Sequence, residues 1–111
     1  MFKNKVKRIS GFQTNRKSGH VSFAFKQKGV EVNSIGFTHN KDDRADKVKL
    51  NHNINPNDKT DCFAKTKVET QRYNTYRNNP NYKDYRIHPE DRPIINKIIT
   101  SDKEKPNKKR K

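Results

Sequence analysis

Residues 21–37 have the sequence VSFAFKQKGVEVNSIGF, and they predict a β-hairpin. Valine and phenylalanine alternate with small or polar residues over 21–25, which is the period of a strand with one buried face. Lys28-Gly29 is a turn signal, and the apolar pattern resumes directly after it. The apolar phase slips by one residue in the second strand, which indicates a bulge or bend near Asn33-Ser34.

Two further strands are predicted, over residues 47–54 and 62–69. In the first, His52 falls on the apolar phase, which favours a core histidine over a ligand. The sequence Asn55-Pro56-Asn57-Asp58 closes that strand as a turn, because proline cannot pair and Asn and Asp make side-chain turns. In the second, one face carries small and polar residues, so its burial is less strongly indicated.

One helix is predicted near the end of the chain, starting at about Asp91 after a short strand over 85–87. His88 serves as a helix-entry residue, and the acids after Pro89 suit the first turn of a helix. Pro93 fits only in that first turn. The apolar stripe consists of Ile94, Ile95, Ile98 and Ile99. Residues 71–85 show neither period and are expected to form a long exposed loop.

These elements predict an α+β fold with about four to five antiparallel strands, as a sheet or a small barrel, and one C-terminal helix packed on it. Residues 18–101 form the domain, residues 1–17 a basic N-terminal arm, and residues 102–111 a disordered basic tail. The strand alternation leaves one face of the sheet basic and the other apolar. The free face, or a groove beside it, is the expected place for a polyanion.

The charge of the chain points to a polyanionic partner. Lys and Arg number 27 against 12 acids, a formal net charge of +15 on 111 residues. Phosphate polymers respond best to such a field, because binding releases their condensed counterions. The tail that ends in Lys108-Lys109-Arg110-Lys111 would add salt-sensitive, sequence-independent affinity. The same charge would also suit an acidic protein partner, an anionic membrane surface, or solubility alone.

The cysteine count and the apolar runs bear on the compartment. Cys62 is the single cysteine and cannot form an intramolecular disulfide, which suits a reduced compartment. No run resembles a signal-peptide core or approaches the ~20 apolar residues of a membrane span. We therefore expect a cytoplasmic protein without membrane contact. No close spacing of His and Cys suggests a metal site, and no cofactor is expected.

His39 and His20 are the candidate catalytic residues. His39 follows the second strand of the hairpin and His20 precedes the first, so the hairpin brings them to the same end. A metal-free RNA-cleaving site needs a group that takes the 2′-hydroxyl proton near neutral pH, which histidine can do. The alternative is that each is a turn residue bonded to a backbone carbonyl.

The candidate nucleic-acid-binding residues combine aromatic rings with cations, a mixture that holds single-stranded RNA by stacking and by phosphate contacts. They are Arg72, Tyr73, Tyr76, Arg77 and Arg86 from the expected loop, and the strand pairs Lys47 with Lys49 and Lys65 with Lys67. The alternatives are a tyrosine-rich loop that packs on the sheet edge and a solvated lysine face.

Four segments carry a resemblance to a known family: residues 19–25 (GHVSFAF), 35–39 (IGFTH), 53–57 (NINPN) and 85–91 (YRIHPED). In this order they resemble the markers of small basic proteins of mobile elements and phages in low-G+C Gram-positive bacteria. That resemblance implies a context but no activity. In size, charge and strand pattern the chain is also loosely similar to the RelE-like and small-barrel toxin ribonucleases of toxin–antitoxin systems.

Three functions follow from these observations. The first is a nucleic-acid-binding protein of a mobile element or phage, with RNA favoured over DNA because helix-turn-helix, zinc-finger and basic-zipper patterns are missing. The second is a metal-independent toxin-like ribonuclease that uses His39 and His20. The third is an inhibitor that binds an acidic host protein, and an acidic antitoxin would be a partner of the same kind. The sequence alone does not decide whether the chain is an enzyme.

Overall fold

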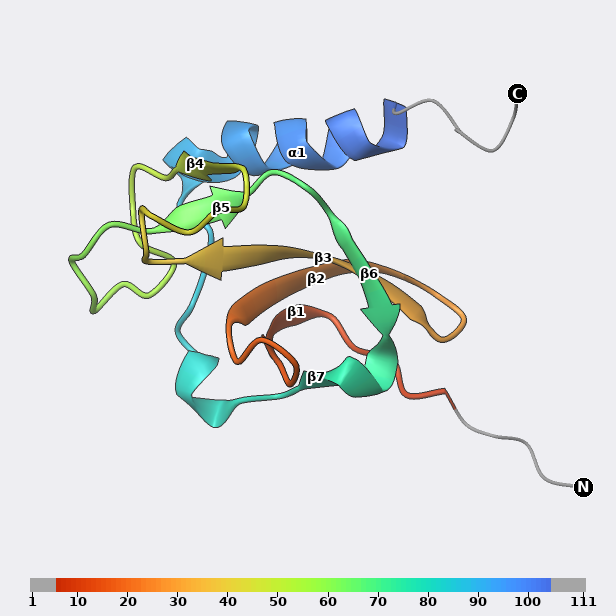
Figure 1. Cartoon of the computed structure of the whole chain (residues 1–111). Helices are drawn as coiled ribbons and strands as arrows, with labels where there is room; N and C mark the ends of the chain where they lie inside the picture. Colours follow the sequence, from red (N-terminus) through yellow and green to blue (C-terminus); the bar gives the residue numbers. More distant parts are fainter. Residues whose placement is uncertain (1–5, 105–111) are drawn as a thin grey trace, which may run out of the picture.

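This computed structural model describes residues 6–104, with side chains as far as Asp102. In chain order the elements are β1 (Gly11–Asn15), β2 (Val21–Lys28), β3 (Glu31–Thr38), β4 (Lys47–Lys49), β5 (Phe63–Lys65), β6 (Glu69–Arg72), the 3₁₀ turn η1 (Tyr73–Thr75), β7 (Tyr76–Arg77), the 3₁₀ turns η2 (Pro80–Tyr82) and η3 (Pro89–Asp91), and α1 (Arg92–Glu104). All strand pairs are antiparallel. The expected α+β fold, an antiparallel sheet with one C-terminal helix, is confirmed (Figure 1).

The predicted hairpin is formed by β2 and β3, and it lies in the middle of the sheet. Its turn contains Gly29, whose φ of +59° lies in the left-handed region that glycine adopts at little cost. The register shifts between Ala24 and Lys26, opposite the neighbours Ser34 and Asn33. The irregularity therefore lies at the predicted position along the hairpin, but the extra residue belongs to β2 and not to β3.

β3 connects the two parts of the sheet. One of its edges pairs with β2 over residues 31–36, and the other pairs with β6 over residues 31–34 and with β5 over residues 37–38. β4 completes the second part by pairing with β5. Both faces of β3 are covered, since residues 34–38 are all buried.

β1 and β7 extend the sheet on its far side. β1 pairs with β2 on one edge and with β7 on the other. Because β6 runs through the three residues of η1 into β7, the two edges of the five-strand path β7-β1-β2-β3-β6 are joined by a very short connection. This part of the sheet is curled like a small barrel, with β7 lying beneath β1 in Figure 1.

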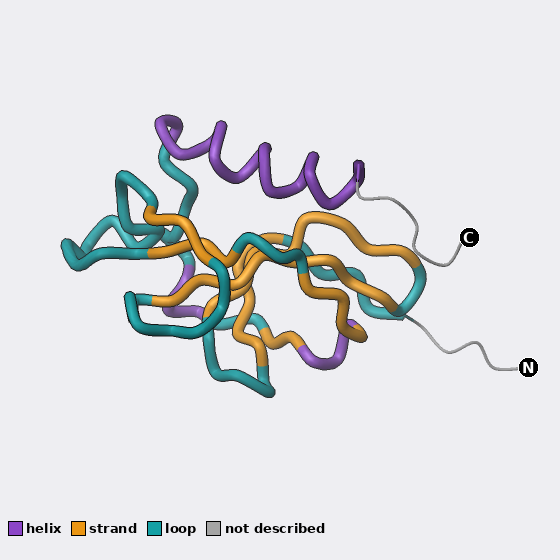
Figure 2. The backbone as a smooth tube through the Cα atoms, turned by 45° about the horizontal axis from the view of Figure 1, so that its top comes forward, coloured by secondary structure: helices purple, strands orange, loops and turns teal. Residues whose placement is uncertain are grey.

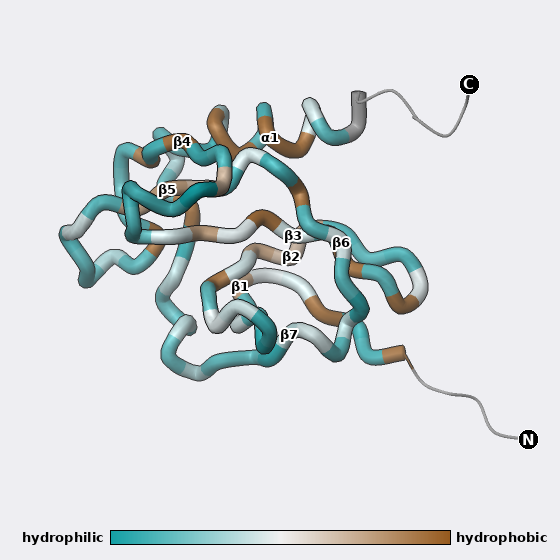
Figure 3. Tube along the Cα trace, viewed as in Figure 1, coloured by the Kyte–Doolittle hydropathy of each residue, from teal (hydrophilic) through white to brown (hydrophobic). Residues whose placement is uncertain are grey.

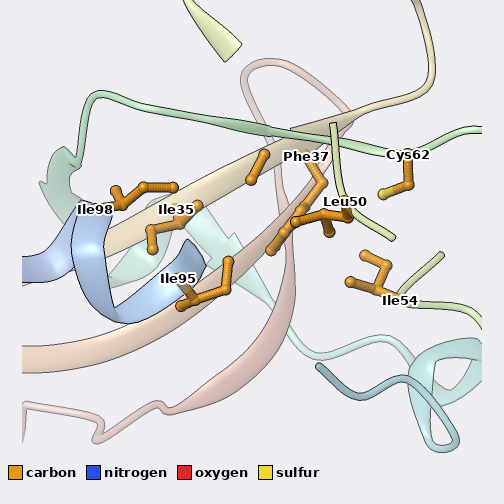
Figure 4. Packing of buried hydrophobic residues seen from close by; sticks show 8 residues of the cluster. Ile35, Phe37, Leu50, Ile54, Cys62, Ile95 and Ile98 are labelled. Carbon is orange, nitrogen blue, oxygen red and sulfur yellow. The ribbon is translucent and has the colours of Figure 1, made fainter. Parts of the chain in front are cut away.

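The main apolar core lies between the sheet and α1. Its buried residues are Ile35, Phe37, Leu50, Ile54, Cys62, Ala64, Ile95 and Ile98. The predicted isoleucine stripe is confirmed: Ile95 and Ile98 point from the helix toward Ile35 and Phe37 (Figure 4). Each such side chain contributes about 1.5–3 kcal/mol by leaving water. Figure 2 shows the helix as a separate layer across the strands, and Figure 3 shows hydrophobic positions recurring along it.

The second face of the hairpin is not the basic surface that the alternation predicted. Ser22, Ala24 and Ser34 are buried there, each at most 2% exposed, and Tyr76 packs on them as part of a second small core. Small side chains allow the β6-η1-β7 segment to lie close to this face. The prediction of a free cationic sheet face is therefore wrong.

Several predicted boundaries also change. The strand expected over 47–54 ends at Lys49, and the strand expected over 62–69 is divided into β5 and β6. The expected loop over 71–85 contains β6, β7 and two 3₁₀ turns, whereas residues 85–87 are not a strand, although Arg86 N–H donates to the carbonyl of Ile54 at 2.9 Å. His52, expected in the core, has a side chain that is 42% exposed.

The ends of the domain differ from those predicted as well. β1 lies inside the expected N-terminal arm, and α1 continues to Glu104, into the expected tail. Residues 1–5 of the arm and 105–111 of the tail lie outside the described residues. Over the part of the chain that is described, no helix has the length and apolar character needed to cross a bilayer.

Candidate nucleic-acid interface

His20 and His39 line the same cavity, at the end of the hairpin opposite its turn. His20 directly precedes β2 and His39 directly follows β3, so antiparallel pairing places them at the same end of the sheet. The cavity has a volume of about 490 Å³. It is lined by Gly19, His20, Val21, Phe37, Thr38, His39, Asn40, Asp43, Asn53, Ile54 and Tyr85. The two histidines thus lie at the same end of the hairpin, as predicted, while their catalytic role stays a prediction.

His39 is exposed and is oriented by one contact. Its Nδ1 lies 3.2 Å from the backbone carbonyl oxygen of Asp61. A carbonyl can only accept, so Nδ1 carries the proton, and the neutral ring keeps a free lone pair on Nε2. In this tautomer His39 can accept a proton from a group in the cavity.

His20 is half-buried and is held through its backbone. Its carbonyl accepts the N–H of Asn15 at 2.9 Å, in a tight turn where Gly19 has a φ of +77°. Its Nδ1 is enclosed and has no hydrogen-bond partner among the residues that the structure describes. Nε2 is therefore the ring nitrogen that is left to exchange a proton with the cavity.

Asp43 brings a carboxylate to the cavity wall. Its Oδ1 accepts the N–H of Ala45 at 2.9 Å, and this hydrogen bond, together with the nearby charges of Lys65, Lys47 and His20, holds the pKa of Asp43 below its usual value. The carboxylate is thus charged at neutral pH.

The lysines of β4 and β5 adjoin the cavity through Asp43. Lys47 and Lys65 are directly opposite each other in the β4–β5 register. Lys47 Nζ donates to the backbone carbonyl of Asp43 at 2.6 Å, and Lys65 Nζ lies 3.9 Å from the Asp43 carboxylate. We call Lys47 and Lys65 the lysine edge. It places two ammonium groups beside the cavity that holds both histidines.

The other two strand lysines are placed differently. Lys49 lies 3.5 Å from the Asp61 carboxylate, the residue whose carbonyl orients His39. Lys67 is exposed, just beyond the end of β5. Among the four predicted lysines, only Lys47 and Lys65 therefore have contacts to a residue that lines the cavity.

The residues of the expected aromatic and basic loop do not form one surface. Arg72 lies opposite Glu31 in the β3–β6 register, at the turn end of the hairpin and away from the cavity. Tyr73, the next residue, is half-buried. Tyr76 is only 4% exposed and its hydroxyl bonds Ser34 Oγ at 2.7 Å, so its ring cannot stack on a base. For Tyr76 the alternative of packing on the sheet is correct.

The remaining two arginines are exposed. Arg77 is opposite Thr14 on β1, and its guanidinium contacts the carbonyl of Asn78 at 3.4 Å. Arg86 directly follows Tyr85, which lines the cavity, and its own side chain lines the neighbouring hollow that contains His52 and His88. Arg86 is therefore the arginine from this segment that lies nearest in sequence to the cavity wall.

The cavity also contains residues that were not among the predicted site residues, and Asp43, Asn53 and Tyr85 are three of them. Tyr85 is stacked on Tyr82 with ring centroids 4.5 Å apart, and burial raises the pKa of its hydroxyl. It gives the cavity an aromatic wall. These residues come from three separate loops, so no local sequence pattern groups them. The tyrosines near residue 85 did suggest base stacking.

A second cluster joins His52, His88 and Glu90, whose ligand-type atoms lie within 4.8 Å of one another. His52 Nε2 is 2.8 Å from Glu90 Oε1, and the two imidazole rings are stacked at 3.6 Å. His88 Nδ1 already accepts the N–H of Glu90 at 3.1 Å. Parallel stacked rings do not aim their lone pairs at one point, so a metal would have to open the stack. In the geometry seen here, the cluster ties a loop to the helix entry.

Comparison of the chain with protein-family models, with curated proteins and with solved structures finds no match. The candidate site is the cavity with two histidines and one carboxylate, together with the lysine edge that adjoins it through Asp43.

Proposed function

We propose that this chain binds RNA, with one nucleotide in the cavity between His20 and His39 and the phosphates beside it on Lys47 and Lys65. The observation that carries the proposal is the contact of both lysines with Asp43, which puts the cationic edge at the cavity. The proposal includes the context suggested by the family resemblance, a mobile element or phage.

The charge of the surface supports a polyanion. Lys49 and Lys65 are the only Lys or Arg side chains within 4 Å of a carboxylate in the described part of the chain. The other Lys and Arg side chains of the described residues are therefore not paired with a carboxylate, and the whole sequence has a net charge of +15. Each Lys or Arg that meets a phosphate releases condensed counterions from the nucleic acid, which favours binding at low salt.

The shape of the site supports a single strand over a duplex. The cavity, at about 490 Å³, is in the size range of small-molecule sites and has Tyr85 in its wall, which suits one unstacked nucleotide. Reading a duplex commonly requires a helix that can enter the major groove. In residues 6–104, α1 is the single α-helix, and its apolar stripe is buried against the sheet.

Binding can be tested with a fluorescently labelled single-stranded RNA of ~12 nucleotides, by anisotropy over a series of salt concentrations. The test variant is Lys47→Gln with Lys65→Gln, and the matched control is Lys26→Gln with Lys28→Gln on β2, which makes the same change in charge away from the cavity. We expect the test variant to reduce the slope of log K against log salt by about 1.4, from ~0.7 per phosphate contact. The control should change the slope by less.

The outcomes separate the possible roles of the charge. Equal losses in both variants would mean that net charge alone drives binding and that the lysine edge is not a site. Absence of binding to both RNA and DNA at low salt would overturn the proposal. The positive charge of the chain would then favour an acidic protein as its partner.

A further inference from the structure

We propose that the cavity cleaves RNA without a metal ion, with His39 as the base that removes the 2′-hydroxyl proton and His20 as the acid that protonates the leaving 5′ oxygen. The inference rests on the proposed RNA binding and adds a reaction to it. It depends on the positions of the two rings at one end of the β2–β3 hairpin and on their different hydrogen-bond environments.

His39 is suited to the role of base by its contact with Asp61. The Nδ1 proton is fixed on the carbonyl oxygen of Asp61 at 3.2 Å, which leaves the lone pair of Nε2 free. The same contact stabilises the imidazolium after proton transfer, because the donor remains bonded. A histidine with one nitrogen held and the other free is the arrangement that general-base catalysis requires.

His20 is assigned the role of acid by its position in the cavity, where His20 and Asp43 both line the wall. Because Nδ1 of His20 is enclosed, the proton is delivered from Nε2. Nδ1 of His39 contacts a backbone carbonyl and Nδ1 of His20 does not, so the two rings have different surroundings.

The reaction is internal transesterification, and its atoms balance without another reactant. Nε2 of His39 takes the 2′-hydroxyl proton as the 2′ oxygen forms a bond to the adjacent phosphorus. The bond from phosphorus to the 5′ oxygen breaks, and the 5′ oxygen takes a proton from Nε2 of His20. The products are a 2′,3′-cyclic phosphate and a 5′-hydroxyl end. Lys47 and Lys65 can stabilise the charge that accumulates on the phosphoryl oxygens.

The roles predict a particular pH profile. Cleavage needs His39 neutral and His20 protonated, so the rate should pass through a maximum and fall on both sides. The same strand with 2′-deoxyribose at every position lacks the attacking hydroxyl. It should still bind and should not be cleaved.

The experiment incubates the full chain with 5′-labelled single-stranded RNA in excess EDTA and follows both cleavage and binding. The test variants are His39→Gln and His20→Gln, and the control is His52→Gln, a histidine outside the cavity. We expect each test variant to lose at least 100-fold in cleavage rate, the lower range of acid–base catalysis, while RNA affinity changes less than about threefold. The control should cleave normally. Circular dichroism and urea unfolding confirm that each variant is folded.

The possible results distinguish the proposed cleavage from the proposed RNA binding on which it rests. Binding without cleavage by the unmodified chain would overturn the catalytic inference and leave RNA binding intact, whereas absence of binding would remove both. Cleavage that stops in EDTA would overturn the metal-free mechanism. Cleavage that survives in both histidine variants would overturn the assignment of the two residues.

Discussion

The carboxylate of Asp91 accepts two hydrogen bonds from Asn51, one from its backbone N–H and one from its side-chain amide, both at 2.8 Å. The other carboxylate oxygen accepts the N–H of His52 at 2.9 Å. Asp91 is completely buried and stands at the entry of α1, where a negative charge is favoured by the helix dipole. This one side chain therefore fixes the segment that leads from β4 to Asn53 and Ile54 in the cavity wall.

Replacement of Asp91 by Asn should destabilise the fold by about 2–3 kcal/mol. The amide has one acceptor instead of two, and its NH₂ group would face a backbone N–H that then loses its partner inside the protein. The measurement is the free energy of unfolding in urea. The control is Asp84→Asn, an exposed position, which should change that free energy by less than ~0.5 kcal/mol. Similar values for the two variants would contradict the anchoring role of Asp91.

Tyr76 should contribute to stability and not to RNA affinity. Its hydroxyl bonds Ser34 Oγ at 2.7 Å inside the second core. Tyr76→Phe should cost about 1–2 kcal/mol by leaving Ser34 without its partner, and adding Ser34→Ala should cost less than the sum of the two single changes. Unfolding of the four proteins in this cycle measures the coupling. RNA anisotropy on Tyr76→Phe should give an unchanged affinity, and a loss of affinity at equal stability would restore the base-stacking role.

The hairpin and the helix could be predicted because their signals are local. The alternation over residues 21–37 and the isoleucine stripe each span a whole element, and both elements bury the residues that the pattern selects. The position of His20 beside His39 followed from the hairpin alone. β1 was missed, since its sequence GFQTN has one large apolar residue and adjoins a run of cations. Gln13 and Asn15 are buried, and the free-energy cost of burying them is offset by the pairing of β1 with strands on both of its edges. No local sequence pattern indicates this pairing.

The rest of the cavity could not be predicted because it depends on contacts between distant residues. Position 52 continues the apolar alternation, but the backbone there is bonded to Asp91, 39 positions later in the sequence, and so leaves the sheet. The β4–β5 register that sets Lys47 against Lys65 joins two strands of only three residues each, which are too short for an alternating pattern to indicate it. Tyr76 was assigned to an exposed loop because its neighbours are polar, although they pair with β1 and β3.

His88 should act as the N-cap of the helix entry. Its Nδ1 accepts the N–H of Glu90 at 3.1 Å, and its ring is stacked on His52. His88→Ala should lower the free energy of unfolding by about 1 kcal/mol, and His88→Asn by less, because an Asn oxygen can accept the same N–H. Chemical denaturation at neutral pH compares the two variants. Equal destabilisation would mean that the stacked rings, and not the cap, carry the effect.

Stability should decrease as the pH rises above about 9. Burial raises the pKa of Cys62 above its ordinary value of 9.0, and burial also raises the pKa of Tyr76 and Tyr85 above 10.0. In this pH range the unfolded chain releases protons that the folded chain retains, so the free energy of unfolding falls with pH until the folded groups also ionise. At pH values below the ordinary pKa values of these three groups, they do not make the free energy of unfolding depend on pH.

Cys62→Ala tests this sign directly, because it removes the group that titrates first. Urea unfolding at pH 8, 9 and 10, with a reducing agent present, gives the slope for each protein. The variant is expected to be less stable at pH 8, from the lost side chain, but to lose less stability between pH 8 and 10 than the unmodified chain. Parallel curves for the two proteins would show that the thiol does not titrate differently in the folded state.

The residues beyond Glu104 should add affinity for RNA and little stability. Residues 105–111 carry five cations and no acid. The predicted domain end at residue 101 would cut α1, whereas a chain ending at Glu104 keeps the whole helix with Ile95 and Ile98 in the core. This shortened chain should unfold at the same urea concentration as the full one. Its RNA affinity should be lower at low salt, and the slope against log salt should be smaller by ~0.7 for each phosphate that the removed cations had neutralised. An unchanged slope would show that these cations do not contact the RNA, and binding would then depend on the lysine edge and the other described cations.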